Sequence, residues 1–265
     1  MGISDKASVK AQYQSSGNLN TRISIHDKYS TNKQGFGNWI TEHYEIENGM
    51  TVLELGCGTG SMWAGKGELI RKCSKLILSD FSEGMLTQTK ETLREETGIT
   101  YEVIDIQDIP YEDQTFDVVI ANMMLYHVPD LWKGLREVRR VLKEDGRFYC
   151  ATYGENGIME YIGSLFESSG VEAHSNHAFS MQNGAEKLSQ VFAEVTSFHY
   201  PDSLEVTNIE DMADYVYSLA GMSGLKEIPR ETMLEVFREN SKNGILYVPK
   251  DYGMFVSYGE KACEA

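Results

Sequence analysis

Short apolar runs alternate with longer amphipathic segments through the middle of the chain. Five β-rich runs predict strands at residues 51–55, 75–79, 100–104, 116–120 and 147–152. The first three begin about 25 residues apart, which is the length of a strand, a crossover helix and two turns. Because the runs do not alternate apolar with polar positions, they are typical of strands buried on both faces, as in a parallel sheet.

The segments between these strands carry helical periodicity. Within residues 131–143, apolar side chains recur at helical spacing, at Leu131, Leu135, Val138 and Leu142. Asp130 stands at the N-cap position of this expected helix, and Gly146 follows its end. Residues 82–95 show a similar apolar stripe. Strands and helices in this order predict a doubly wound, Rossmann-like α/β core over about residues 45–155.

The flanks of this core have a different character. Residues 1–44 are polar and aromatic, and we expect them to form short helices that act as an N-terminal lid. Residues 45–265 are expected to form one domain, with cap or insertion segments at about 154–181 and 208–242. A last β-rich run, at residues 252–258, predicts a final strand.

Composition narrows the partners. The chain has 265 residues with 24 Lys+Arg against 40 Asp+Glu, a formal net charge of −16. This balance disfavours nucleic acid and anionic membranes as partners, because polyanions bind basic surfaces. No run approaches the roughly 18 apolar residues of a membrane span. The four cysteines form no CxxC pair, which favours reduced thiols and a cytoplasmic protein, and the histidines show no metal-ligand spacing.

A glycine-rich turn follows the first strand. Gly56, Gly58 and Gly60 alternate with other residues directly after residues 51–55, and glycine permits positive φ and close approach of a ligand. A dinucleotide fingerprint would have a further glycine where Trp63 stands, and a P-loop would end in Gly-Lys-Ser/Thr. Glu54 lies inside the strand before the turn, where a carboxylate opposes a pyrophosphate but suits a cationic ligand.

Polar residues also follow the next three strands. Asp80 ends the second strand, Asp105 and Ile106 follow the third, and Asn122 begins the segment 122–130 after the fourth. The carboxyl ends of neighbouring strands line one crevice in a doubly wound fold. An acid at Asp80 suits ribose hydroxyls, Asp105 with Ile106 suits adenine, and the segment from Asn122 is where cofactor and substrate would meet.

Taken together, these stretches resemble the class I S-adenosylmethionine-dependent methyltransferases, and most closely the small-molecule branch of ubiquinone/menaquinone-biosynthesis type. The resemblance covers about residues 50–152, with four motifs in family order and spacing. It implies a seven-stranded, Rossmann-like sheet, mostly parallel with an antiparallel last strand, and S-adenosylmethionine as the cofactor.

The resemblance also implies site residues. The turn residues Gly56, Cys57, Gly58 and Gly60 would cradle the methionine part, Asp80 would hold the ribose, and Phe81 and Met85 would flank the adenosine. Asp105 and Ile106 would contact adenine, and Asn122 and Met123 would lie near the sulfonium. Candidate cofactor contacts in the sequence are Glu54, Gly56, Cys57, Gly58, Gly60, Asp80, Phe81, Met85, Asp105, Ile106, Asn122 and Met123, with Tyr13 and Tyr29 from the lid.

The expected reaction is in-line transfer of a methyl group to a small-molecule acceptor, which gives S-adenosylhomocysteine. Alignment of the reactants supplies most of the acceleration in such a reaction. His127 is the first candidate for a general base, with Tyr126 and His26 as others. His127 could equally be a packing residue, and Cys57 a small filler. A nicotinamide-dependent oxidoreductase, a nucleic-acid methyltransferase and a silent cofactor-binding protein remain as alternatives.

Overall fold

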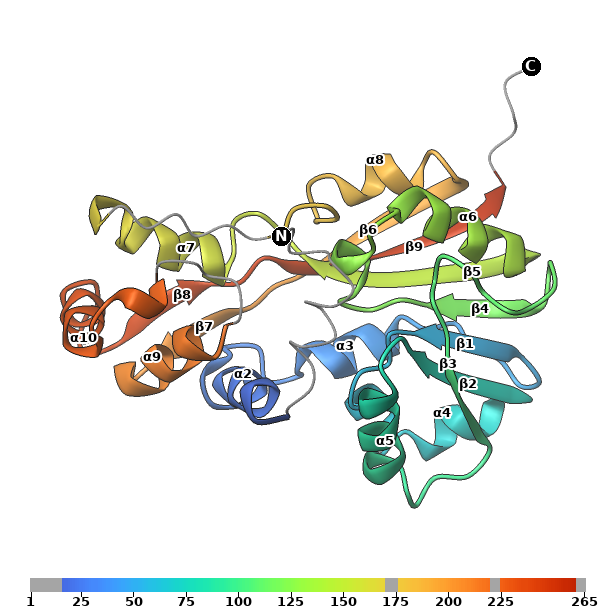
Figure 1. Cartoon of the computed structure of the whole chain (residues 1–265), viewed down its shortest axis with the longest axis horizontal. Coiled ribbons are helices and arrows are strands. Elements are labelled where there is room, and N and C mark those ends of the chain that lie inside the picture. The colour runs from blue at the N-terminus through green and yellow to red at the C-terminus, as the bar shows by residue number, and fades with distance from the viewer. Residues whose placement is uncertain (1–15, 170–175, 220–224, 261–265) are drawn as a thin grey trace.

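The computed structural model describes residues 16–169, 176–219 and 225–260 and contains a seven-stranded sheet (Figure 1). The strand order is β3-β2-β1-β4-β5-β9-β6. The strands run β1 Thr51–Leu55, β2 Lys75–Asp80, β3 Ile99–Val103, β4 Phe116–Ile120, β5 Leu142–Tyr153, β6 Phe192–Tyr200 and β9 Tyr252–Glu260. Of these, β1 and β4 have the predicted bounds, β2 extends one residue further than predicted, and β3 begins and ends one residue earlier than predicted.

The sheet has the direction pattern that the sequence predicts. Strands β1 to β5 pair in parallel, whereas β9 lies antiparallel to both of its neighbours, β5 and β6. The last strand in the chain is therefore the antiparallel one. The predicted class, a doubly wound, seven-stranded Rossmann-like sheet, is confirmed.

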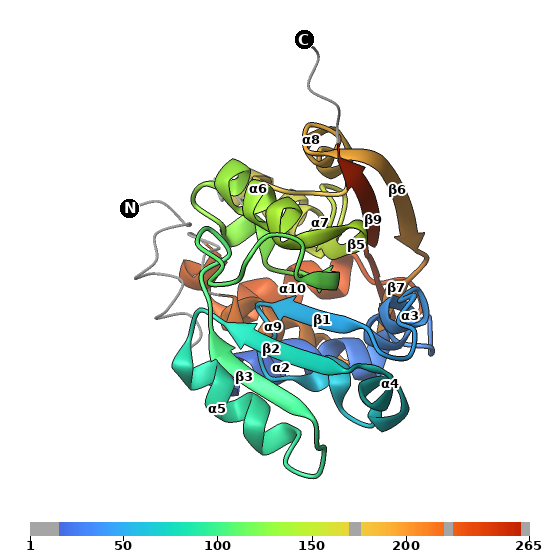
Figure 2. The same cartoon turned by 90° about the vertical axis from the view of Figure 1, so that its right-hand side faces the viewer.

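Helices cover both faces of this sheet (Figures 1 and 2). The apolar core on one face contains residues of α6 and α8, and the core on the other face contains residues of α3, α4 and α5. The helices run α3 Phe36–Glu42, α4 Gly67–Lys72, α5 Glu83–Thr92, α6 Leu131–Val141 and α8 Gly184–Leu188, with short 3₁₀ turns η1 Ser61–Trp63 and η2 Leu125–His127.

Local chemistry accounts for the starts of the two best predicted helices. Asp130 Oδ1 accepts the backbone N–H of Lys133 at 2.9 Å, which caps α6 as expected. Ser82 caps α5 in the same way, because its hydroxyl accepts the N–H of Met85 at 3.4 Å. Both helices then turn their apolar stripes toward the sheet.

The end of α6 is placed differently from the prediction. The helix ends at Val141, and β5 begins at Leu142 without a loop, so Gly146 lies inside the strand instead of after the helix. The polar residues Lys143–Asp145 conceal the first half of this strand from a reading based on apolar runs. The strand is therefore 12 residues long, twice the predicted length.

A second group of elements stands beyond the carboxyl ends of β1 and β4, at the left of Figure 1. It is built on a two-stranded sheet that the sequence analysis did not predict, β7 Ser203–Val206 paired antiparallel with β8 Leu246–Pro249. The helices α2 Ser16–Tyr29, α7 Ile158–Leu165, α9 Ile209–Ser218 and α10 Arg230–Glu239 share its apolar core, together with the short turn η4 Leu225–Glu227. We call this group the cap.

The cap contains elements from both predicted accessory regions. The helix α7 lies within the segment expected at about 154–181, and the helices α9 and α10 lie within the segment expected at about 208–242. The N-terminal segment contributes α2 to the cap and α3 to the face of the main sheet. The proposed division at residue 44 and the role of the first segment as a lid remain predictions. Within the described ranges, no helix combines the length and apolar character of a membrane span.

Candidate functional site

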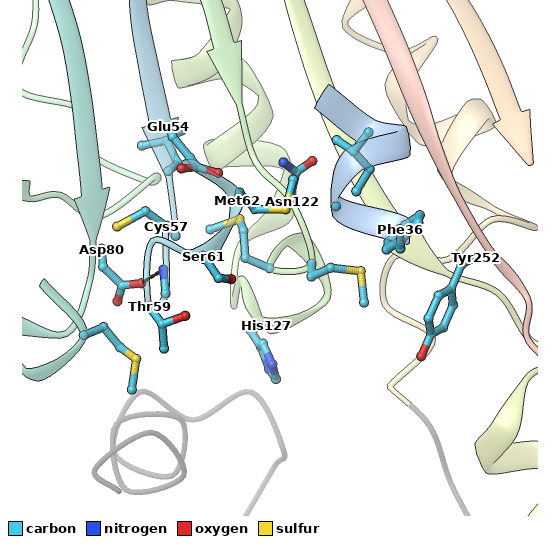
Figure 3. Close-up of a pocket in the computed structure, with 18 of the residues that line it drawn as sticks. Phe36, Glu54, Cys57, Thr59, Ser61, Met62, Asp80, Asn122, His127 and Tyr252 are labelled. Atoms are coloured by element: carbon cyan, nitrogen blue, oxygen red, sulfur yellow. Dashed lines mark hydrogen bonds between the residues drawn. The ribbon is translucent and has the colours of Figure 1, made fainter. Parts of the chain in front are cut away.

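A cavity of about 780 Å³ lies between the carboxyl ends of the parallel strands and the cap. Its walls come from the turn after β1, the tip of β2, the segments after β3 and β4, the region around α2 and α3, and the junction of β8 with β9. Figure 3 shows Glu54, Cys57 and Asp80 on one side, with Phe36 and Tyr252 on the other. Residues far apart in the chain therefore share one chamber.

Most of the predicted site residues line this cavity. They are Glu54, Gly56, Cys57, Gly58, Asp80, Phe81, Met85, Asp105, Ile106, Asn122, Met123 and His127. Gly60 and Tyr29 are absent from its walls, and Tyr13 lies outside the described residues. The alternative base candidates His26 and Tyr126 also line the cavity.

The glycine turn has the backbone that its sequence predicts. Gly56, Gly58 and Gly60 have φ values of 74°, 58° and 74°, which is the left-handed region that favours glycine. A Cβ at Gly60 would lie 2.7 Å from Thr89 Cγ2, so this glycine packs the turn against α5. At Gly58 no heavy atom lies within 4 Å of the corresponding Cβ position, so the backbone there is open to a close neighbour.

Cys57 is a buried filler of this turn. Its Sγ lies 3.5 Å from the Thr89 hydroxyl. Burial, with the nearby charge of Glu54, raises the pKa of the thiol well above its ordinary value. The side chain therefore stays a thiol at neutral pH and is a poor nucleophile.

Asp80 joins the two turns that border the cavity. Its Oδ2 accepts the N–H of Gly58 at 3.0 Å, and its Oδ1 accepts the N–H of Ser82 at 2.8 Å. Burial raises the pKa of Asp80, although these backbone hydrogen bonds oppose the change. The residue thus organises the turns and lines the cavity, where its carboxylate keeps acceptor capacity for a ligand hydroxyl.

Glu54 is a buried acid with one fixed oxygen. Its Oε2 accepts the indole N–H of Trp63 at 2.7 Å. Burial raises the pKa of Glu54 to about 7, while the Trp63 hydrogen bond opposes the shift and the nearby Asp80 adds to it. A carboxyl group in this state is poised to ionise when a positively charged ligand arrives.

The segments after β3 and β4 add polar groups. Asp105 Oδ1 accepts the backbone N–H and the side-chain amide of Gln107, both at 3.0 Å. Asn122 donates from Nδ2 to the Tyr44 hydroxyl at 2.6 Å and accepts the N–H of Ala151 at 3.1 Å. Asn122 is thus held by its neighbours on both sides of its amide, and it still lines the cavity.

Met123 and His127 complete this wall. Met123 has a backbone φ of 54°, in the left-handed region. This conformation is uncommon for any residue other than glycine and is an outlier for a bulky side chain such as methionine. Burial, together with the charge of Arg22, lowers the pKa of His127 to about 4. The imidazole is therefore neutral at physiological pH, and its basicity is low for a general base.

Tyr29 is committed to the cap. Its hydroxyl donates to Asp211 Oδ2 at 2.5 Å, and Lys28 pairs with the same oxygen at 3.0 Å. These contacts tie the end of α2 to α9, which explains why the ring does not reach the cavity.

Sequence reasoning did not identify the cap side of the chamber as a functional surface. Phe36, Lys250 and Tyr252 line it, together with His26. Phe36 was visible only as one aromatic residue of the N-terminal segment, and Lys250 and Tyr252 belong to no motif. Their approach depends on the pairing of β7 with β8, which are 40 residues apart in the sequence and carry no local signal.

Comparison with known proteins supports this architecture. A family described as the methyltransferase domain matches residues 53–150, the stretch that the four motifs mark. UbiE, the ubiquinone/menaquinone biosynthesis C-methyltransferase of Escherichia coli (strain K12 / DH10B), is 31% identical over 126 residues. That alignment covers 46% of this chain and 50% of UbiE, so the chain spans about half the length of the curated relatives it matches.

Solved structures share the fold at low sequence identity. YcgJ from Bacillus subtilis has a TM-score of 0.57 at 16% identity, over 85% of this chain and 98% of its own. A SAM-dependent methyltransferase from Aquifex aeolicus has a TM-score of 0.51 at 16% identity, over 69% of this chain and 89% of its own. At this identity the likeness concerns the fold alone.

Proposed function

We propose that the protein transfers a methyl group from S-adenosylmethionine to a small-molecule acceptor, and the premise is the match of residues 53–150 to the methyltransferase domain family. The matched domain and the 31% identity to UbiE support the methyltransferase resemblance, and with it S-adenosylmethionine as the cofactor. The single observation that carries the proposed activity is the shared chamber, in which the glycine turn and the cap face one cavity of about 780 Å³. That volume lies toward the upper end of the range of about 300–1,000 Å³ for ligand sites.

The residues of the strand tips fit the cofactor. Asp80 retains acceptor capacity toward the cavity and would hold the ribose hydroxyls. Glu54 would accept from the α-amino group, and its carboxylate suits the positive charge of the ligand. The open backbone at Gly58 would let the methionine part approach closely. Phe81 is 41% exposed, and with Met85, Asp105 and Ile106 it would form the adenine site.

When bound, the cofactor supplies a methyl carbon already activated by the sulfonium. In the transfer, the C–S bond would break as the bond to the acceptor forms, the sulfur would keep the electron pair, and the proton of the acceptor would pass to solvent. The protein's task is to align the groups and exclude water, which is proximity catalysis. Asn122, fixed by Tyr44 and Ala151, gives this region a rigid wall.

His127 would contact the acceptor in this arrangement. In the view of Figure 3 it lies between Asp80 and Tyr252, which is where the two halves of the cavity meet. Its neutral imidazole can accept a hydrogen bond from an acceptor hydroxyl. Because the pKa of His127 is lowered to about 4, we assign it to positioning of the acceptor in preference to strong general-base catalysis.

The test is a turnover assay with isotopically labelled S-adenosylmethionine and a panel of small phenols, amines, thiols and carbon acids, with an oligonucleotide arm included. Methylated product from a small molecule supports the proposal. Product only from the oligonucleotide would transfer the assignment to a nucleic-acid methyltransferase. Tight cofactor binding with no product in any arm would favour the silent binding protein.

A further inference from the structure

The chamber has opposite charge in its two halves. The strand-tip half carries three acids, Glu54, Asp80 and Asp105, and one cation, Lys66, whose Nζ donates to Asn38 Oδ1 at 2.8 Å. Among the described residues, the charged side chains on the cap wall are Arg22, Lys33 and Lys250 with one acid, Asp27. The cap wall thus has more cations than acids, whereas the whole chain has more acids than cations, with 24 Lys+Arg and 40 Asp+Glu. This local field is attractive to an anion.

Lys250 is the buried cation on that wall. Its side chain is 2% exposed, and its Nζ donates to Ser30 Oγ at 3.0 Å and to Asp202 Oδ2. The ring centroids of Tyr200 and Tyr252 lie 5.7 Å and 5.1 Å from the same nitrogen. An ammonium has three N–H donors, so within the described ranges one donor of this cavity-lining group has no oxygen acceptor.

Asp202 fixes the Lys250 ammonium from the side away from the cavity. It accepts the N–H groups of Asn32 and Ser203 at 2.9 and 2.8 Å, and the Thr31 hydroxyl at 3.2 Å. Burial alone would raise the pKa of Asp202, but the hydrogen bonds from Asn32 and Lys250 lower it. Its side chain is 0% exposed and is absent from the cavity wall. A ligand would therefore meet the ammonium side of the pair.

Aromatic rings line the wall beside Lys250, and they are tilted against one another, by 41° between Phe36 and Tyr252 and by 58° between His26 and Tyr252. The rings of Phe36 and Tyr252 lie 5.2 Å apart between centroids, and the ring of His26 lies 5.9 Å from Tyr252. Burial, with the nearby Lys250 charge, lowers the pKa of His26 to about 3, so this imidazole is neutral and adds no positive charge of its own. Figure 3 shows Phe36 and Tyr252 across the cavity from Asp80. An aromatic ligand can stack on one of these rings and meet a neighbouring ring with its edge.

We propose that Lys250 determines acceptor specificity by binding an anionic oxygen, such as a carboxylate, of a planar aromatic acceptor that packs against Phe36 and Tyr252. This inference rests on the proposed methyl transfer, because it assigns the strand-tip half of the chamber to the cofactor. The Asp202–Lys250 pair orients the donor, and the aromatic wall supplies ring faces and edges that contact the ligand. Charge-assisted hydrogen bonds of this kind are stronger than neutral ones.

The test measures binding with S-adenosylhomocysteine already saturating, so that the cofactor's own carboxylate cannot account for the result. The probes are matched pairs, benzoate with benzamide and 2-naphthoate with 2-naphthamide, titrated by calorimetry or by ligand-detected magnetic resonance. We expect each acid to bind at least tenfold tighter than its amide. Equal affinity within a pair would overturn the inference.

The decisive variant removes both partners, Lys250→Met with Asp202→Asn, so that no unpaired buried charge is left behind. We expect S-adenosylhomocysteine affinity within twofold of wild type and loss of the preference for the acid. If Lys250 served only to neutralise Asp202, the double variant would keep that preference. Lys33→Gln, which removes an exposed cation of the same wall, is the matched control and should keep most of it.

A crystal structure of the wild-type protein with S-adenosylhomocysteine and 2-naphthoate tests the same claim without any variant. We expect the carboxylate within hydrogen-bond distance of Lys250 Nζ, and a carboxylate bound elsewhere in the chamber would contradict the inference. Failure of the underlying function gives a different result, because S-adenosylhomocysteine itself would then not bind.

Discussion

The indole nitrogen of Trp63 lies 2.7 Å from Oε2 of Glu54, and both side chains are almost completely buried. Trp63 occupies the place where a dinucleotide fingerprint would have a glycine. Trp63 therefore has two consequences. It argues against a nicotinamide site, and its hydrogen bond orients Glu54, the acid that we expect to face a cationic ligand. This link between two positions of one motif underlies the first two predictions.

Replacement of Trp63 by phenylalanine removes the donor and leaves a buried acceptor without its partner. We expect Trp63→Phe to lower the free energy of unfolding by about 1–3 kcal/mol, as found for a lost buried hydrogen bond. Urea unfolding followed by circular dichroism measures this change. Trp132→Phe is the control, because Trp132 is 40% exposed. Similar losses of unfolding free energy in both variants would show that the hydrogen bond to Glu54 does not contribute to stability.

Cofactor affinity should depend on pH through Glu54. Its pKa is about 7 in the folded protein without ligand, so as pH falls below 7 the carboxyl is protonated and no longer attracts a cation. We expect the dissociation constant of S-adenosylmethionine to rise toward about tenfold per pH unit below that value. Glu54→Gln should bind more weakly at pH 8 and lose this dependence between pH 6 and 8.

The same shift affects stability with a defined sign. The pKa of Glu54 rises from 4.5 to about 7 on folding, so stability present below pH about 4.5 is lost as pH rises to about 7. Glu54→Gln should therefore have a higher melting temperature than wild type at pH 8, and the difference should shrink at pH 5. A constant difference between these two pH values would contradict the shifted pKa.

Loss of Asp80 should weaken the cofactor complex. Asp80→Ala removes the acceptor proposed for the ribose, and we expect a loss of about 1.5–3 kcal/mol in S-adenosylhomocysteine binding. Because Asp80 also accepts from Gly58 and Ser82, the melting temperature of the free variant must be measured alongside. Asp108→Ala, at an exposed acid of a nearby loop, is the control, and an unchanged dissociation constant for Asp80→Ala would count against the ribose role.

Two glycines should respond in opposite directions to alanine. A Cβ at Gly253 in β9 would lie 2.3 Å from the Phe198 carbonyl oxygen, so Gly253→Ala should destabilise the protein, by about 1–3 kcal/mol for an overpacked site. At Gly84 in α5 the nearest atom is 3.6 Å away, so Gly84→Ala should stabilise by roughly 0.5–1 kcal/mol. Thermal denaturation of the two variants checks both signs.

The sheet was predictable because its signals are local. The strands β1 and β4 are short β-rich runs with clear boundaries, and the helix α5 buries the predicted stripe Met85, Leu86, Thr89 and Leu93. The early start of β5 was hidden by the polar residues 143–145. The pair β7–β8 was missed because each strand has only four residues and its partner is distant in the sequence.

The site likewise contains residues that local sequence signals predict and residues that only the tertiary fold brings together. Glu54 lies near the end of β1, Asp80 ends β2 and Asp105 follows β3. Their convergence follows from the parallel sheet, because the carboxyl ends of its strands meet at one edge. Lys250 and Asp202 reach the cavity region through the fold of the cap, and no spacing in the sequence joins them to His26. Gly60 was expected at the ligand because of its motif, but its left-handed turn packs against Thr89 instead.

The most direct test of the account is isothermal titration calorimetry of the purified protein with S-adenosylhomocysteine, and separately with NAD and NADP. The cavity at the strand tips should bind S-adenosylhomocysteine at one site with micromolar or tighter affinity and give no heat with either nicotinamide dinucleotide. Binding of NAD or NADP with none of S-adenosylhomocysteine would contradict it.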